Sequence, residues 1–320
     1  MKERTKLNKN FPINLPQLQI GKFFDYGIFF ILMGFKEMLQ EELLKTNSIP
    51  EDLLQHLPRG FQELNRRAIL NLKPPLQPYG KEIAIAMHSI LHRIEAVWVR
   101  SGQIEGKFRQ PKGLTHVWGD ESTEVIVSEN GVRYKFDFTR IMFAKGNTHE
   151  RSLLPKKIKK GEVIIDMFAG IGYFSLGIAK SKKPQKMYSI EWNPESFKYL
   201  QENVKLNHVE SIITPIFGDC KENIMKLVKQ GVRADRIIMG LLPAPVDAIE
   251  YAIQATKDEG TIVIYEGVEP KESTLMFDEF TQIANDNGYE TQLLERRLVK
   301  AFKPHEYHVV IEILVKKKFQ

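Results

Sequence analysis

Acidic side chains end two neighbouring apolar runs in the middle of the chain, and a pair of glycines lies between the runs. Asp166 closes the run at 162–167, Gly170 and Gly172 come directly after it, and Glu191 closes the next run. Glycine can take positive φ and lets a ligand lie against bare backbone. A carboxylate in the position of Glu191 can accept both ribose hydroxyls of an adenosine. These residues in this order predict a strand, a ligand-binding turn and a helix.

Two further segments follow apolar runs in the same way. Asp219, after the run 212–217, is well placed to accept the amino group of an adenine. It can equally serve as the N-cap of a helix at 221–229. We expect Cys220 to pack beside the adenine or in the core rather than to react. The turn Gly240-Leu-Leu-Pro243 follows the run 236–239, and loops at the carboxyl ends of parallel strands line the ligand crevice.

The identity of the ligand follows from Asp166 more than from the glycines. A dinucleotide fingerprint has a third glycine, and that position is Ser175 here. Asp166 ends its strand facing the turn, where it would repel a pyrophosphate. S-adenosylmethionine (AdoMet) carries adenosine, a sulfonium and an ammonium but no phosphate, so a carboxylate suits it. The residues favour AdoMet over a dinucleotide, and a merely structural turn is the remaining alternative.

Composition and length describe an ordinary globular protein with room for two domains. The 320 residues are 42% hydrophobic and 27% charged, and the net charge of +6 permits an acidic polymer as partner. Cys220 is the only cysteine, which fits a reducing cytosol, so we expect a cytoplasmic protein. The longest apolar stretch, 27–35, is too short to cross a bilayer, and no membrane association is expected. His149 has no second His or Cys at ligand spacing, so no metal is predicted.

The second half of the chain alternates strands with helices. Its expected strands are 162–167, 186–190, 212–217, 236–239 and 261–265, and its expected helices are 173–180, 194–207, 221–229, 246–256 and 277–287. This alternation predicts an α/β Rossmann-like, class I AdoMet-dependent transferase domain at 141–320. Two antiparallel edge strands, 293–300 and 307–315, are expected to close the sheet. His305 and His308 are then expected on the surface of those edge strands.

The first half predicts a smaller α+β domain, at 1–140. Its expected helices are 36–45 and 81–92, and its expected strands are 68–72 and 96–99. The runs 124–128 and 133–138 alternate around Asn130-Gly131, which is a strong hairpin signal. We expect residues 137–152 to link the two domains.

A basic segment near residue 110 is the candidate contact for nucleic acid. Lys107, Arg109 and Lys112 flank Phe108, and this pairing suits a phosphate backbone with a stacked base. A solvated loop has the same composition, so the segment alone leaves both interpretations open.

Five motifs in order resemble the archaeal wybutosine-synthesising tRNA-Phe aminocarboxypropyltransferases. They are Lys107-Phe-Arg-Gln-Pro, the hairpin, Met142-Phe-Ala-Lys-Gly-Asn-Thr-His-Glu-Arg151, Asp166-Met-Phe-Ala-Gly-Ile-Gly-Tyr-Phe174 and Gly240-Leu-Leu-Pro243. The resemblance extends over most of the chain from about Leu57. It implies transfer of the 3-amino-3-carboxypropyl group of AdoMet to C7 of 4-demethylwyosine, next to the anticodon. It also implies that the first domain contacts the anticodon stem-loop through Lys107, Arg109 and Lys112. No obligatory protein partner is indicated.

The resemblance also assigns residues to the cofactor site. Arg151, Glu191 and Asp219 match family positions that contact AdoMet, and Ala144 stands where many members have serine. The predicted cofactor site comprises Ala144, Lys145, Arg151, Asp166, Phe168, Gly170, Gly172, Glu191, Asp219, Cys220, Gly240, Leu241 and Pro243. Arg151 or Lys145 is the candidate cation for the carboxylate of the methionine arm. No catalytic residue is assigned, because no base for the C7 proton is evident.

The related tRNA guanine-N1 methyltransferases are the alternative within this superfamily. Their fourth strand usually ends in Asn-Leu-Pro, and the asparagine position is Gly240 here. Glycine leaves room for a tricyclic base, and Tyr173 after Gly172 also favours the aminocarboxypropyl branch. A non-catalytic RNA-binding protein that keeps the ligand fold is a third hypothesis.

Overall fold

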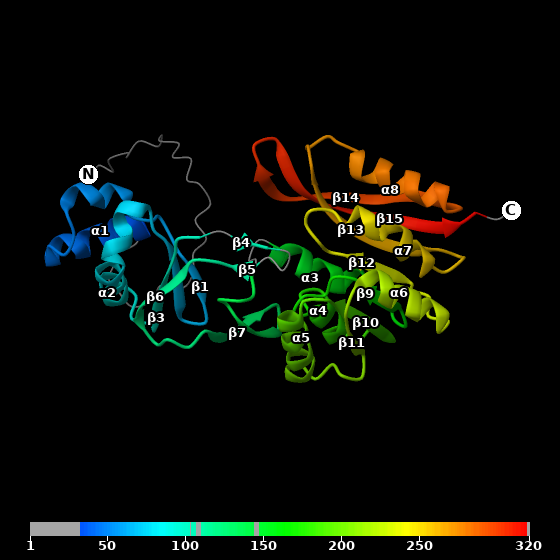
Figure 1. Ribbon diagram of the computed structural model, residues 1–320, viewed down its shortest axis with the longest axis horizontal. Coiled ribbons are helices and arrows are strands. Elements are labelled where there is room, and N and C mark those ends of the chain that lie inside the picture. The colour runs from blue at the N-terminus through cyan, green and yellow to red at the C-terminus, as the bar shows by residue number, and fades with distance from the viewer. Residues whose placement is uncertain (1–32, 103, 107–109, 144–146, 319–320) are drawn as a thin grey trace, which may run out of the picture.

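The computed structural model describes residues 33–102, 104–106, 110–143 and 147–318. Figure 1 shows a smaller blue-to-cyan part beside a larger green-to-red part. Lys107, Arg109, Ala144, Lys145 and the stretch 28–32 lie outside the described residues. No described helix is long and apolar enough to cross a membrane.

The smaller part packs two helices on a four-stranded sheet. Its elements are α1 (Phe35–Thr46), η2 (Glu51–His56), β1 (Gln62–Leu64), β2 (Arg67–Asn71), η3 (Pro74–Tyr79), α2 (Gly80–Ile90), β3 (Ala96–Arg100), β4 (Ile104–Glu105), β5 (Gln110–Pro111) and β6 (Leu114–Gly119). The sheet order is β1-β2-β3-β6, and only β2 and β3 run parallel. Leu39 and Leu43 of α1 share a buried cluster with Ile83 and Met87 of α2. The expected helices and strands of this part are confirmed.

The larger part is built on a seven-stranded sheet. Its elements are α3 (Thr148–Lys157), β9 (Val163–Asp166), α4 (Ser175–Lys180), β10 (Lys186–Glu191), α5 (Pro194–Leu206), β11 (Ile213–Phe217), α6 (Cys220–Lys229), β12 (Arg236–Met239), η5 (Val246–Ala248), α7 (Ile249–Gln254), β13 (Thr261–Glu269), α8 (Leu275–Asp286), β14 (Tyr289–Lys303) and β15 (Glu306–Lys317). The order is β11-β10-β9-β12-β13-β15-β14. The first five strands are parallel, and β15 and β14 are antiparallel to their neighbours. The α/β fold predicted from the sequence is confirmed.

Strand β9 lies at the centre of the parallel strands and has β10 on one side and β12 on the other. Ile164 and Ile165 are completely buried, one in each of the two hydrophobic clusters that cover the faces of the sheet. A strand covered on both faces reads as a continuous apolar run, which is why the sequence identified it. Strand order reverses at β9, so the carboxyl ends of β9, β10 and β12 border the crevice where such sheets bind ligands.

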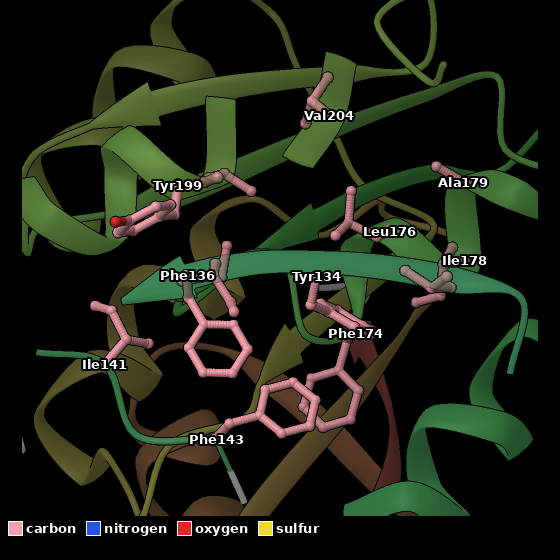
Figure 2. Packing of buried hydrophobic residues seen from close by; sticks show 14 of the residues in the cluster. Tyr134, Phe136, Ile141, Phe143, Phe174, Leu176, Ile178, Ala179, Tyr199 and Val204 are labelled. Carbon is pink, nitrogen blue, oxygen red and sulfur yellow. The ribbon is translucent and has the colours of Figure 1, made fainter. Parts of the chain in front are cut away.

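A β-hairpin of β7 (Glu124–Glu129) and β8 (Val132–Asp137) turns at Asn130 and Gly131, which both have positive φ. The predicted hairpin is therefore confirmed. Tyr134 and Phe136 point from β8 into the hydrophobic cluster that also contains Leu176 and Tyr199 (Figure 2). The hairpin thus shares its core with the larger part, although it lies on the 1–140 side of the expected division. The division at residue 140 itself stays a prediction.

The side chain of Asn203 attaches the hairpin to α5. Its Oδ1 accepts a hydrogen bond from the backbone N–H of Lys135 at 2.7 Å. Its Nδ2 donates to the carbonyl oxygens of Lys135 and Ile171, each at 3.1 Å. Asn203 is completely buried, so no water can replace these three bonds.

The expected linker 137–152 is wrong from residue 148 onward, because α3 begins there. Leu154 is completely buried in the core, and Glu150 is 1% exposed. Arg297 of β14 donates from Nη2 to Oε2 of Glu150 at 2.9 Å. A buried ion pair with a distant strand holds α3 in place, and the polar sequence of 147–151 gave no sign of that partner.

The expected position of 307–315 is also wrong, since β15 lies between β13 and β14 and only β14 forms the edge. His308 consequently is not on the surface but is completely buried. His305 is exposed in the turn between the two strands, with φ of 66°.

Replacing Asn203 by alanine should lower the free energy of unfolding by about 2 to 4 kcal/mol, because it leaves buried backbone groups without partners. Urea denaturation followed by circular dichroism measures the change. Lys205→Ala on the exposed face of the same helix is the matched control and should change stability by less than about 0.5 kcal/mol. Equal stability of the two variants would contradict the structural role of Asn203.

Candidate active site

A cavity of about 710 Å³ opens at the carboxyl ends of the central strands. It lies at the predicted crevice, where β9, β10 and β12 end. Of the predicted cofactor residues it is lined by Arg151, Phe168, Gly170, Glu191, Asp219, Cys220, Gly240, Leu241 and Pro243. A volume of this size matches pockets that enclose a nucleotide-sized molecule. The structure therefore brings most of the described candidates together around one cavity.

The turn after β9 requires glycine at two positions. Gly170 has φ of 58° and Gly172 has φ of 97°, in the region that L side chains rarely adopt. A Cβ at Gly170 would meet the ring of Tyr173 at 2.6 Å, and one at Gly172 would meet Leu176 at 2.7 Å. The two glycines thus allow both the backbone conformation and the close packing of the helix that follows. Gly172 does not itself line the cavity.

Asp166 lies beneath this turn rather than in the cavity wall. Its side chain is completely buried, and its Oδ2 accepts a hydrogen bond from Ser175 Oγ at 2.6 Å. Ser175 Oγ is also 2.7 Å from Ser189 Oγ on β10. Burial raises the pKa of Asp166 to about 7, although the bond from Ser175 opposes that shift. This arrangement explains the serine at the third position of the glycine pattern, since it supplies the donor that a buried carboxyl requires.

Glu191 joins the glycine turn to the end of β10. Its Oε2 accepts from the backbone N–H of Gly170 at 2.7 Å, and its Oε1 accepts from the N–H of Asn193 at 2.7 Å. The side chain is 8% exposed, and burial raises its pKa above the ordinary range of a glutamic acid. Each carboxylate oxygen has a second lone pair that can accept a ligand hydroxyl.

Asp219 and Cys220 form the part of the wall contributed by the loop after β11. Asp219 Oδ1 accepts from the N–H of Lys221 at 2.8 Å and of Glu222 at 3.4 Å, so it is the N-cap of α6. The adenine contact stays a prediction beside this confirmed capping role. Cys220 is 7% exposed, and burial raises the pKa of its thiol to about 12. It packs in the core, as predicted, and is protonated at neutral pH.

Arg151 approaches the cavity from the first turns of α3 and is held rigidly. Its Nε and Nη2 donate to the two carboxylate oxygens of Glu129 at 2.6 and 2.9 Å. Its guanidinium carbon also lies 5.2 Å from the centre of the Phe143 ring. A two-pronged ion pair fixes the orientation of the guanidinium, so Arg151 can present its charge to a ligand without first being ordered.

Gly240 lies where the chain leaves β12, and a phenylalanine ring fills the space beside it. A Cβ at Gly240 would meet Cε2 of Phe174 at 2.6 Å. Both residues line the cavity. Any side chain at position 240 would therefore have to displace the Phe174 ring. Because Gly240 has no side chain, the ring can form this part of the wall.

Several cavity residues were missed in the sequence, and Trp192, Lys300 and Glu266 are the ones whose side chains matter most for a charged or aromatic ligand. Trp192 is 44% exposed, and its place in the sequence directly after a predicted ribose acceptor was an available signal. Lys300 comes from β14, whose position over the cavity no local pattern reveals. Glu266 follows the apolar run 261–265 as Asp166 follows its own run, and this parallel was also available.

Of the predicted RNA-binding residues, only Lys112 is among the described residues, and it does not line this cavity. Lys112 is exposed in the smaller part, beyond β5. In the described part of the chain, no group of three or more His, Cys, Asp or Glu side chains is placed to hold a metal ion.

The fold is that of a class I AdoMet-dependent transferase. Its parallel sheet is completed by antiparallel β15 and β14, a glycine turn follows β9, and an acidic residue ends β10. Sequence comparison gives the particular family. The TRM5/TYW2 methyltransferase domain matches residues 125–292, and the TYW2 N-terminal domain matches residues 40–122. The chain belongs to the TRM5/TYW2 family.

Individual relatives agree with this assignment. The chain is 35% identical to the tRNA(Phe) (4-demethylwyosine(37)-C(7)) aminocarboxypropyltransferase of Pyrococcus horikoshii, covering 88% of this chain and 98% of that one. It is 32% identical to the tRNA (guanine(37)-N(1))-methyltransferase Trm5b of Pyrococcus abyssi, covering 92% and 89%. The crystal structure of P. horikoshii TYW2 in complex with MeSAdo superposes with a TM-score of 0.73 at 30% identity, covering 89% of this chain and all of that one.

Replacing Asp166 by asparagine should remove one component of the pH dependence of stability. Between pH values of about 3.8 and about 7 the folded chain holds a proton on Asp166 that the unfolded chain has lost. The free energy of unfolding therefore falls as the pH rises through this window, by at most about 1.4 kcal/mol per pH unit. Urea denaturation at several pH values should show a shallower decline for Asp166→Asn.

The control for this experiment is Glu210→Gln, a change at an exposed carboxylate. It should follow the wild-type curve. A constant offset between wild type and Asp166→Asn at every pH would contradict the raised pKa.

Proposed function

We propose that this protein transfers the 3-amino-3-carboxypropyl group of AdoMet to C7 of 4-demethylwyosine in tRNA-Phe. The observation that carries the choice of transferred group is the match of the TYW2 N-terminal domain to residues 40–122. The methyltransferase domain at 125–292 is common to both branches of the family and does not separate them.

The cavity residues fit AdoMet. Gly170 brings backbone to the cavity where a Cβ has no room, Glu191 offers carboxylate oxygens to ribose hydroxyls, and Trp192 offers an aromatic face to the adenine. Asp219 stands at the end of β11, where it can accept from the adenine amino group. A sulfonium makes each carbon attached to it an electrophile, and this is the chemistry that AdoMet supplies.

The contribution of the protein is to decide which of those carbons faces the RNA base. Arg151, whose orientation is fixed by Glu129, lines the cavity and is the cation proposed for the carboxylate of the amino-acid arm. Gly240 and Phe174 shape the wall on the side of β12, where the base would lie. Holding the amino-acid arm of AdoMet and the RNA base in the reactive orientation can lower the activation barrier of the transfer by roughly 7 kcal/mol or more.

The smaller part and the basic residues around it would bind the anticodon stem-loop. The chain carries a net charge of +6, and Lys112 is exposed on the smaller part. Lys107 and Arg109 are proposed for the same surface. A cytoplasmic location accords with a tRNA substrate and with a single, unpaired cysteine.

A methyl transfer to N1 of guanosine-37 is the second candidate function. The observation in its favour is the 32% identity to Trm5b of P. abyssi over 92% of this chain. Gly240 is evidence against methyl transfer, since the asparagine typical of those methyltransferases would have to displace the Phe174 ring.

Mass analysis of tRNA-Phe after incubation with enzyme and AdoMet separates the two. With tRNA that carries 4-demethylwyosine, we expect a gain of the aminocarboxypropyl group and release of methylthioadenosine. With unmodified tRNA-Phe we expect no gain. The addition of a single methyl group to guanosine would instead show that the protein is a guanine-N1 methyltransferase.

Replacing Glu191 by glutamine should weaken AdoMet binding about ten- to a hundredfold, because the ribose hydroxyls lose a charged acceptor. Wild-type affinity should fall as the pH is lowered through the raised pKa of Glu191, since protonation removes an acceptor, and Glu191→Gln should show a flatter profile. Isothermal titration calorimetry measures both. Glu222→Gln, at an exposed carboxylate of α6, is the control and should bind as the wild type does. Parallel pH profiles for wild type and Glu191→Gln would exclude this role.

A further inference from the structure

Glu266 is a buried carboxylate in the wall of the cavity, and the proposed function assigns it no contact with AdoMet or RNA. It lies on β13, one residue after Tyr265, which is aligned with Met239 of β12. Glu266 is therefore level with Gly240 at the end of the neighbouring strand. Its side chain is 2% exposed and belongs to the cavity lining. This position is on the opposite side of β9 from Glu191 and Asp219.

One oxygen of this carboxylate is held and the other is not. His308, completely buried on β15, has its Nε2 at 3.2 Å from Oε2 of Glu266. In the tautomer that carries the proton on Nε2, His308 donates to this oxygen. Oε1 of Glu266 is buried, and no described residue supplies it with a hydrogen-bond partner. A buried acceptor without a donor is costly, and such groups in folded proteins generally have a partner when the protein works.

The charges around Glu266 favour a cation as that partner. Asp166 and Glu191 place two more carboxyl groups along the same edge of the sheet, and the charge of Glu266 contributes to the raised pKa of Asp166. The cavity arginine, Arg151, is already paired with Glu129. Lys300 also lines the cavity, where it is exposed. A positively charged ligand group near Glu266 would thus meet a carboxylate whose Oε1 has no partner among the described residues.

AdoMet has two cationic groups, and they differ in what they can do. The sulfonium lies next to the ribose and has no hydrogen to donate. The ammonium ends the amino-acid arm and donates hydrogen bonds. If Glu191 and Asp219 hold the adenosine, the arm can extend across β9 and β12 toward β13, where only a donor satisfies Oε1.

We propose that Glu266 binds the ammonium of the 3-amino-3-carboxypropyl arm of AdoMet, and that His308 positions the Glu266 carboxylate for this contact. The proposal rests on the AdoMet-dependent function given above. Arg151 would take the carboxylate of the same arm from the side of α3. An arm whose α-carbon is held through both its ammonium and its carboxylate turns its γ-carbon, rather than the methyl group, toward a base bound beside Gly240.

Calorimetric titration of the full-length protein with three ligands tests the contact. AdoMet and decarboxylated AdoMet both carry the ammonium, whereas methylthioadenosine lacks the arm. For Glu266→Gln we expect affinity for AdoMet and for decarboxylated AdoMet to fall about ten- to a hundredfold, with affinity for methylthioadenosine unchanged. Equal losses for all three ligands, or no loss for any, would overturn the proposal.

A glutamate of the same strand provides the matched control. Glu269 is 4% exposed on β13, pairs with Arg296 and does not line the cavity. Glu269→Gln should leave the ratio of the AdoMet and methylthioadenosine affinities at the wild-type value, even if it lowers stability. A changed ratio in this control would show that any buried carboxylate on β13 influences the arm, and would overturn the assignment to Glu266.

The positioning role of His308 is tested through the same ratio. His308→Gln keeps an N–H donor for Glu266 and should keep most of the preference for AdoMet over methylthioadenosine. His308→Leu removes the donor and should lose it, whereas a purely structural histidine would leave the ratio unchanged in both variants. Failure of the proposed function gives a different result, since a protein without an AdoMet site binds none of the three ligands. A methyltransferase that uses Glu266 would show the same changes in affinity for the three ligands, but it would add a methyl group rather than the aminocarboxypropyl group to tRNA-Phe.

Discussion

Two backbone hydrogen bonds to one carboxylate hold the site together. Glu191 accepts from Gly170 in the turn after β9 and from Asn193 in the turn after β10, so the ends of two strands are tied through one side chain. Asn203 of α5 supports the same turn, because its Nδ2 donates to the carbonyl of Ile171 between the two glycines. Beneath it, Ser175 and Ser189 connect α4 and β10 to Asp166. The cavity therefore has a floor of buried acids whose hydrogen bonds go to the protein itself.

Tyr173 extends this organisation to the segment in front of the cavity. Its hydroxyl donates to the carbonyl of Met142 at 2.5 Å, and its own carbonyl accepts from the hydroxyl of Tyr134 at 3.1 Å. The residue after the glycine turn thus fixes both the hairpin and the chain that leads into α3. Because Arg151 lies on α3, its position depends on the same contacts. Tyr173, which the sequence suggested as a feature of the aminocarboxypropyl branch, therefore also holds the hairpin and the segment before α3 in place.

The sequence predicted the parts of the molecule in which a residue pattern and its environment coincide. The buried strands β9 and β12 are short apolar runs, the hairpin has Asn130-Gly131, and the glycine turn has two required glycines, so each was identified. Helix α3 was missed because its stability comes from Leu154 in the core and from the pair of Glu150 with Arg297, which is 147 residues away. His308 was placed on the surface because local alternation cannot reveal that β14 lies outside β15. Glu266 ends an apolar run and could have been noted for that reason, but its position beside Gly240 depends on the pairing of β12 with β13.

Cys220 has a further consequence for a protein that holds a reactive sulfonium. A thiolate is a strong nucleophile toward alkyl groups, and a thiol is a weak one. Cys220 lines the cavity, yet burial keeps it protonated at neutral pH. If AdoMet occupies this cavity as proposed, the protonated thiol of Cys220 would be a poor nucleophile toward it, and burial would limit self-alkylation of the protein.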